Sequence, residues 1–175
     1  MISEGSFRTM LLGAAEMKTP LEELIPEYQN RLYAAAFGIC RNRCDAEDVV
    51  QEAFLKYYLW EKDFESTGHI RSWLMRVTVN LARDRVRSFW NRNKVEWEDY
   101  MDSIPFESPE DRDLFAAVMK LPEKYRIVLH LYYYEDYSVQ EIARILKKNE
   151  NTVKSCLSRG RSRLKDMLKE EWEDD

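Results

Sequence analysis

Apolar residues recur every three or four positions along most of the chain, which is the spacing of an amphipathic helix. The first such stretch covers residues 21–39 and follows Thr19 and Pro20, a pair typical of a helix start. A second stretch begins at Asp45, a suitable N-cap, and a third covers residues 69–89. No strand-like alternation is present. The chain is therefore predicted to be all-α.

Four further helices are predicted in the second half of the chain. One covers residues 111–120, and the sequence Leu121-Pro122 restarts the chain in a helix that ends near Tyr134. Residues 138–168 then carry two helices joined by a tight turn.

The two groups of helices are separated by a segment of different character. Residues 92–109 are acidic, aromatic and proline-containing, with no sustained period, which is typical of a linker. We therefore predict two small helical domains, residues 20–91 and residues 110–169, joined by a flexible linker. Residues 1–19 are predicted to be a mobile leader, and residues 170–175 an acidic tail that frays.

The segment 138–165 has the pattern of a helix-turn-helix motif. Ser138 and Glu141 have the spacing of a capping box. The following Lys-Lys-Asn-Glu-Asn predicts a sharp turn in which Asn takes the left-handed conformation. In the second helix, Val153 and Leu157 are predicted to face the first.

The outer side of this second helix carries cations and short hydrogen-bonding groups. In a recognition helix such groups reach base edges and phosphates in the major groove. An ordinary amphipathic hairpin with a solvated basic face is the alternative interpretation. The candidate contacts to duplex DNA are Thr152, Lys154, Ser155, Ser158, Arg159 and Arg163.

The predicted helix over residues 69–89 has a basic side opposite its apolar stripe. Its polar residues are three, four and seven positions apart and so share one face. Asn can pair with adenine edges, arginines can hold phosphates, and aromatic rings can stack on unpaired bases. A solvated, salt-bridged face would carry the same charges. The candidate residues are Phe64, Arg76, Asn80, Arg83, Asp84 and Arg87.

The charge balance suggests that the chain does not bind DNA alone. The 175 residues include 27 Lys and Arg against 32 Asp and Glu, which gives a formal net charge of −5. Proteins that bind DNA unaided are usually basic overall. Here the basic residues are segregated onto particular helices, so we expect weak intrinsic affinity that is supported by a larger partner.

Cysteine usage and hydropathy point to a chain that stays in the cytoplasm. Three cysteines without disulfide spacing are expected to be reduced thiols. A zinc site at Cys40 and Cys44 with a histidine is conceivable but has no supporting pattern, so we expect no metal and no cofactor. No apolar run reaches the length of a membrane span, and the first residues lack the basic region of a signal peptide.

Several separate motifs give the chain a family resemblance. Residues 45–54, DAEDVVQEAF, are similar to a "DAEDLVQEVF" signature. On these motifs, residues 21–168 resemble an extracytoplasmic-function sigma factor of bacterial RNA polymerase, in group four of the sigma-70 family. The other matching segments are Arg71-Ser72-Trp73-Leu74, Asn80-Leu81-Ala82-Arg83-Asp84 with Arg87, Leu121-Pro122, Glu141-Ile142-Ala143 and Thr152-Val153-Lys154-Ser155.

The resemblance implies an alternative sigma factor, a two-domain factor of transcription initiation with no enzymatic activity. Its first domain would bind the clamp helices of the largest polymerase subunit and then melt and read the minus-ten element. Its second domain would read the minus-thirty-five element as duplex and contact the polymerase flap. An anti-sigma factor is a further expected partner. The residues implied for polymerase binding are Asp45, Glu47, Asp48, Gln51 and Glu52.

Two positions depart from the family pattern. Lys147 stands where the turn often has Gly, and Cys156 stands where the recognition helix often has Arg. By the resemblance, the second change removes a charged contact to phosphate or base.

Two rival interpretations explain less of the chain. A stand-alone helix-turn-helix regulator would account for residues 110–168 but not for the polar helices of residues 45–89. A metal-dependent nuclease using Glu47 and Asp48 has no supporting spacing, because carboxylates in the first turn of a helix are explained by the helix dipole.

Overall fold

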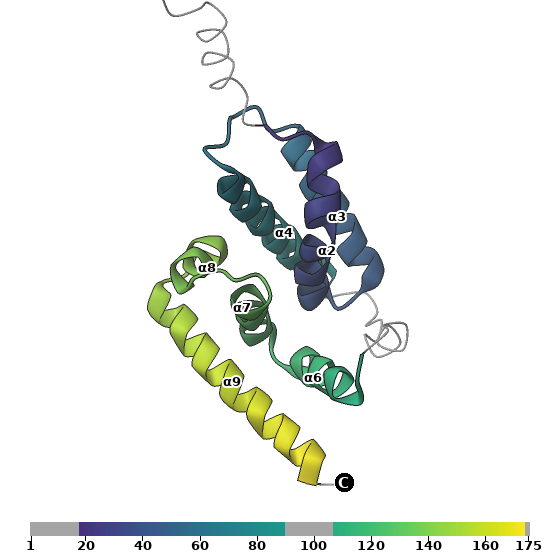
Figure 1. The fold of residues 1–175 in the computed structure, drawn as a ribbon, viewed down its shortest axis with the longest axis vertical. Coiled ribbons are helices and arrows are strands. Elements are labelled where there is room, and N and C mark those ends of the chain that lie inside the picture. The colour runs from purple at the N-terminus through teal and green to yellow at the C-terminus, as the bar shows by residue number, and fades with distance from the viewer. Residues whose placement is uncertain (1–17, 90–106, 174–175) are drawn as a thin grey trace, which may run out of the picture.

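All regular elements of the computed structural model, which describes residues 18–89 and 107–173, are helices (Figure 1). The first domain contains α2 (Leu21–Cys40), α3 (Arg43–Tyr58) and α4 (Thr67–Phe89). The second contains α6 (Pro109–Lys120), α7 (Glu123–Tyr133), α8 (Val139–Leu146) and α9 (Glu150–Glu173). The all-α prediction is confirmed. Residues 1–17 of the expected leader and residues 92–106 of the expected linker lie outside the described residues.

The turn between α2 and α3 is shorter than predicted. Arg41 ends α2 in the left-handed conformation, with φ at 55°. Asn42 then caps α3, and its side-chain oxygen accepts a hydrogen bond of 3.0 Å from the Asp45 backbone N–H. The prediction that Asp45 is the N-cap is therefore wrong. Asn42 is equally suited to capping and comes first after the left-handed residue, so Asp45 falls inside the first turn.

The first domain is a three-helix bundle in which each helix contributes one buried stripe. Leu32 of α2, Val49 of α3 and Leu74 of α4 are each at most 1% exposed. These stripes leave Glu47, Asp48 and Gln51 of α3 and Arg76, Asp84 and Arg87 of α4 exposed on the other sides of their helices.

The second domain follows the predicted caps, with two differences. Ser138 and Glu141 form the predicted capping box at the start of α8. The left-handed residue of the turn is Lys147, with φ at 52°, instead of the predicted Asn. Asn149 serves as a cap, because its side chain accepts a 2.7 Å hydrogen bond from the Thr152 backbone N–H. Helical backbone also extends to Glu173, into the segment predicted to be an acidic tail.

The two domains pack directly on each other. In Figure 1, α7 and α8 lie beside α2 and α4, and α9 runs along the outer side of the second domain. Sequence patterns carried no prediction of this arrangement. It decides which parts of the polar helices remain exposed.

Candidate polymerase and nucleic-acid interfaces

The recognition helix α9 has one buried side and one open side. Val153 and Leu157 are 0% and 4% exposed, which confirms the prediction that they face the core. Gly160 is also buried, and a Cβ atom there would lie 3.2 Å from a Leu129 methyl carbon and 3.3 Å from Tyr125 Cβ. A side chain at Gly160 would therefore require Leu129 or Tyr125 of α7 to shift by a few tenths of an ångström.

The open side of α9 presents most of the residues predicted to contact duplex DNA. Exposed side chains cover successive turns of the helix, and the exposed members of the predicted set are Lys154, Ser155, Ser158, Arg159 and Arg163. Thr152 is half-buried beside its cap. Arg163 lies at the edge of this surface, with its guanidinium carbon 5.3 Å from the centre of the Tyr125 ring.

Cys156 lies on the flank of α9 between the two sides. It is half-buried and packs against the core. An arginine placed there would emerge at the edge of the exposed side of α9, where it would compete for space with core side chains.

The polar face of α4 is only partly open. Arg76, Asp84 and Arg87 are exposed, and Asn80 is half-buried. Arg87 forms a surface ion pair with Asp84 at 3.5 Å. Arg83 differs from the others, because both its Nε and an Nη donate to Glu123 of the second domain, at 3.0 and 2.8 Å.

Phe64 does not have the placement that base stacking requires. Its side chain is 2% exposed. Its ring stacks on Tyr57 at 5.3 Å between centroids and meets Trp73 edge-on at 5.6 Å. The loop between α3 and α4 folds this ring into the aromatic core of the first domain, so we correct its assignment from base contact to core.

The outer face of α3 carries the residues predicted to bind polymerase. Glu47, Asp48 and Gln51 are exposed, and Glu52 is about half exposed. Glu47 pairs with Arg43 at 2.8 Å and Glu52 with Lys56 at 3.6 Å. Asp45 is different, because its side chain is only 16% exposed; it faces Arg85 of α4 at 3.9 Å, and the exposed Asp48 faces the same arginine at 3.4 Å. Asp45 therefore braces α3 against α4.

An apolar patch, which no sequence pattern predicted, continues this face at the end of α3. Leu55, Tyr58 and Leu59 are 54%, 64% and 65% exposed. Leu55 follows Gln51 by four positions, so the patch extends the polar face along the same side of the helix. The sequence does contain a signal for this patch, because these three apolar residues lie outside the helical spacing of the buried stripe.

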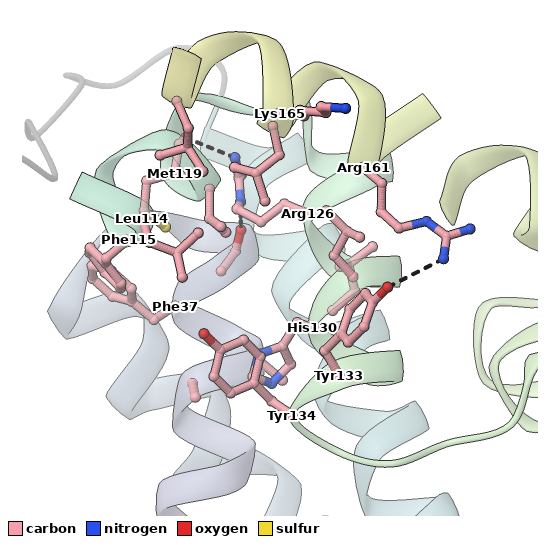
Figure 2. Close-up of a pocket in the computed structure, with 18 of the residues that line it drawn as sticks. Phe37, Leu114, Phe115, Met119, Arg126, His130, Tyr133, Tyr134, Arg161 and Lys165 are labelled. Atoms are coloured by element: carbon pink, nitrogen blue, oxygen red, sulfur yellow. Dashed lines mark hydrogen bonds between the residues drawn. The ribbon is translucent and has the colours of Figure 1, made fainter. Parts of the chain in front are cut away.

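A large groove lies between the domains, and no sequence pattern predicted it. It has a volume of about 860 Å³ and is lined by α2, α6, α7 and α9. Figure 2 shows Phe37 and Phe115 at one end and His130, Tyr133 and Tyr134 at the other. Cations of α9, including Arg161 and Lys165, stand on its rim. Its lining is mainly apolar, which suits a hydrophobic partner surface.

Burial changes the acid–base behaviour of two groups beside this groove. Loss of solvent, reinforced by the nearby charge of Arg31, lowers the pKa of His130 to about 4. His130 is therefore neutral at pH 7. Loss of solvent also lowers the pKa of Arg126 to about 10, which leaves that guanidinium charged.

The cysteines do not form a metal site within the described residues. Cys40 is half-buried, with its Sγ 3.8 Å from the carbonyl oxygen of Ala82, and burial raises its pKa to about 12. No cluster of three or more metal-ligating side chains occurs in residues 18–89 and 107–173. In the same residues, no helix combines the length and the apolar character that crossing a membrane requires.

Two family models match the chain, one on each domain. Residues 24–92 match Sigma-70 region 2, and residues 111–164 match Sigma-70, region 4. The chain is 33% identical over 161 residues to the ECF RNA polymerase sigma factor SigE of Mycolicibacterium smegmatis. That match covers 84% of this chain and 61% of the relative. It is also 30% identical over 144 residues to the RNA polymerase sigma factor SigV of Bacillus subtilis, which covers 81% of this chain and 87% of the relative.

Two solved structures share the fold. The sigma factor RpoE in complex with the anti-sigma factor NepR from Bartonella quintana superposes with a TM-score of 0.64 at 24% identity. That likeness covers 85% of this chain and 96% of the other. CnrH in complex with the cytosolic domain of CnrY gives a TM-score of 0.62 at 24% identity, covering 85% and 86% of the two chains.

Proposed function

Because the chain belongs to the extracytoplasmic-function group of the sigma-70 family, we propose that it is an alternative sigma factor that directs core RNA polymerase to promoters. One observation carries the proposal: the two family regions occur in order on two separate helical domains, and each presents a polar helix face. A stand-alone helix-turn-helix regulator would leave the first domain without a role.

The face of α3 is our proposed polymerase contact. Glu47, Asp48 and Gln51 give it negative and polar character, suited to a basic surface such as we expect on the clamp helices of the largest subunit. The exposed Leu55, which follows on the same side, would add apolar contact area. Asp45 supports this face from behind and Glu52 borders it.

The face of α4 is our proposed contact to the minus-ten element. Asn80 can read a base edge, while Arg76 and Arg87 can hold the backbone of a separated strand. Asp84 and Arg83 complete the set on the same side of the helix. With Phe64 in the core, any stacking on unpaired bases falls to other side chains.

The open side of α9 is our proposed contact to the minus-thirty-five element. Lys154 and Arg159 are long enough to reach phosphates or bases, whereas Ser155 acts only at short range. With a net charge of −5, the free chain is expected to bind duplex weakly and to gain specificity in the complex with polymerase.

The groove between the domains is our proposed site for a regulatory partner. Both solved relatives are bound to another protein, in one case an anti-sigma factor. An amphipathic helix with acidic residues would place its apolar side in the groove and its acids near Arg161, Lys165 and Lys169. We place the chain in the cytoplasm, where core polymerase and promoter DNA are found.

Run-off transcription with core polymerase over a genomic promoter library tests the proposed function. We expect transcripts that start at a restricted set of promoters, which share one spaced pair of sequence elements. A chain that neither co-purifies with core polymerase nor changes its choice of start sites would contradict the proposal.

A further inference from the structure

The last turn of α3 is tied to the residues that precede α2. The ammonium of Lys18 donates to two backbone carbonyl oxygens, at 2.8 Å to that of Tyr58 and at 2.6 Å to that of Trp60. In the reverse direction, the Tyr57 hydroxyl donates to the carbonyl oxygen of Thr19 at 3.0 Å. These hydrogen bonds join the start of the first domain to the end of α3, and we call them the α3 clasp.

The clasp satisfies groups that the end of a helix leaves open. The last carbonyl groups of an α-helix have no partner within the helix, and their partial negative charge favours a nearby cation. The Tyr57 carbonyl still accepts from the Trp60 N–H, at 3.1 Å. The next carbonyl along the chain, that of Tyr58, is the one that Lys18 binds. Lys18 therefore caps α3 from outside the helix.

The clasp is anchored on the aromatic core of the first domain. Tyr57 is 1% exposed, and its ring lies 5.3 Å from that of Phe64 and 6.2 Å from that of Trp73. The Lys18 ammonium lies 5.6 Å from the centre of the Tyr57 ring, within reach of a cation–π attraction. Pro20, with φ at −57°, then leads into α2. Both ends of the clasp are therefore held by neighbouring structure.

The same contacts fix the backbone of the exposed apolar patch of α3. The two carbonyl groups that Lys18 binds lie on either side of Leu59, whose side chain is 65% exposed. One of them belongs to Tyr58, which is 64% exposed. Exposed apolar groups that lie together mark interaction surfaces. A surface whose backbone is already fixed loses less conformational freedom on binding, so the clasp favours association.

The clasp begins before the part of the chain that the family match covers. The match to Sigma-70 region 2 starts at residue 24, whereas Lys18 and Thr19 precede it. The contact is therefore a feature of this chain that the match does not imply.

We propose that Lys18 is a positioning residue for polymerase binding, which holds Leu55, Tyr58 and Leu59 through the clasp in the arrangement that core polymerase contacts. Core polymerase is the partner to which we assign the patch, because Leu55 continues the polar face of α3 one turn after Gln51. The role in binding rests on the proposed function of the α3 face, whereas the clasp itself does not.

Hydrogen–deuterium exchange of the free full-length chain tests the clasp. Lys18→Met keeps the length of the side chain and removes its donors, so the amides of Leu59 and Trp60 should exchange about five- to tenfold faster. Lys18→Arg, which can still donate to two carbonyl groups, should restore slow exchange.

The matched control for exchange is Lys62→Met. Lys62 is an exposed lysine of the loop that follows α3, and its ammonium lies 5.9 Å from the centre of the Trp60 ring. This variant loses the same charge and should exchange as the wild type does. Unchanged exchange in Lys18→Met, or equal acceleration in Lys62→Met, would overturn the clasp.

Affinity for core polymerase without DNA tests the positioning role. Lys18→Met should weaken binding by about three- to tenfold, whereas Lys18→Arg and Lys62→Met should bind as the wild type does. In a chain that already carries Leu55→Ser and Leu59→Ser, with its helical content checked by circular dichroism, Lys18→Met should cause little further loss. The reason is that Lys18 acts through the side chains that are already removed.

The outcomes separate the positioning role from the proposed function. If the wild type binds core polymerase and Lys18→Met causes an equal loss in both backgrounds, or no loss in either, the positioning role is overturned alone. A wild type that does not bind core polymerase would overturn the proposed function and the positioning role together, and the exchange result on the clasp would stand.

Discussion

The helices α4 and α9 have similar patterns of apolar and basic residues, but they differ in how far their basic residues are free of contacts with the rest of the protein. Each is long, amphipathic and basic on its outer side, with 23 and 24 residues. On α9, Lys154 and Arg159 are exposed, and neither takes part in a salt bridge within the described residues. On α4, Arg83 is tied to the second domain. The proposed surface for duplex DNA on α9 is thus exposed, whereas one member of the proposed strand-reading face of α4 is paired with Glu123.

The largest expected difference is in stability, between substitutions on the buried side of α9 and substitutions on its exposed side. Leu157→Ala removes a buried side chain from the second domain and should lower its free energy of unfolding by about 2 to 5 kcal/mol. Ser158→Ala, one position further on the exposed side, should change it by less than about 0.5 kcal/mol. Denaturant melts of both variants measure the difference. Equal effects would mean that the inner and outer sides of α9 are wrongly placed.

Acid should weaken the region where the domains meet. Burial lowers the pKa of His130 from 6.5 to about 4, so the unfolded chain binds a proton in this range before the folded chain does. The contribution of His130 to stability is then greatest above about pH 6.5 and falls by roughly 3 kcal/mol as pH drops to about 4. Glu135 acts in the opposite sense, because burial raises its pKa.

Chemical denaturation between pH 7 and pH 4 measures this dependence. His130→Gln should flatten the slope, because the protonation difference is removed. The chain's other histidine, the exposed His69, supplies the control, and His69→Gln should keep the wild-type slope. If His69→Gln flattened it equally, the burial of His130 would not be the cause.

Substitutions on the α3 face should weaken polymerase binding without weakening the fold. Asp48→Lys together with Gln51→Ala should weaken binding to core polymerase by about tenfold, because an acidic contact becomes basic. The melting temperature should change little, since both side chains are exposed and the pair of Asp48 with Arg85 at 3.4 Å lies at the surface, where ion pairs contribute little. Glu61→Lys makes the same charge change elsewhere in the first domain and should keep the affinity. Parallel loss of binding and melting temperature would show that these residues act as structural supports.

The smallest expected effect is a difference in salt dependence between two arginines of α9, one that contacts phosphate and one that stacks on a ring. Arg159→Ala should lower duplex affinity for all sequences alike and reduce the salt slope by about one. Arg163→Ala should reduce the slope less, because that guanidinium lies against Tyr125. Titrations with the polymerase complex at several salt concentrations give both slopes. A larger loss for Arg163 would reverse their roles.

Local patterns in the sequence predicted the helices and their inner faces. The capping box of Ser138 and Glu141 and the burial of Val153 and Leu157 depend on residues three to four positions apart, which a sequence displays directly. The cap at Asn42 was missed, because two suitable residues, Asn42 and Asp45, lie three positions apart. The left-handed Lys147 was missed because Asn149, two positions later, has a stronger preference for that conformation and serves as a cap instead.

Long-range contacts could not be predicted in the same way. Phe64 was assigned to base stacking, and only the fold shows that its loop turns the ring onto Trp73. Arg126 reaches Gly38 across 88 positions of sequence, and Arg71 reaches Glu135 across 64. No periodicity links such pairs, so the docking of the domains and the groove between them came from the structure alone.

The most direct test of the division of labour between α4 and α9 is transcription from promoters with a pre-melted minus-ten bubble. Templates carry base changes either in the bubble or in the minus-thirty-five duplex, and polymerase is loaded with Asn80→Ala/Asp84→Ala or with Ser155→Ala/Arg159→Ala. The α4 variant should lose discrimination among bubble bases and keep it in the duplex, and the α9 variant should do the reverse. An α4 variant that discriminates bubble bases as well as wild type would contradict the assignment of α4 to strand reading.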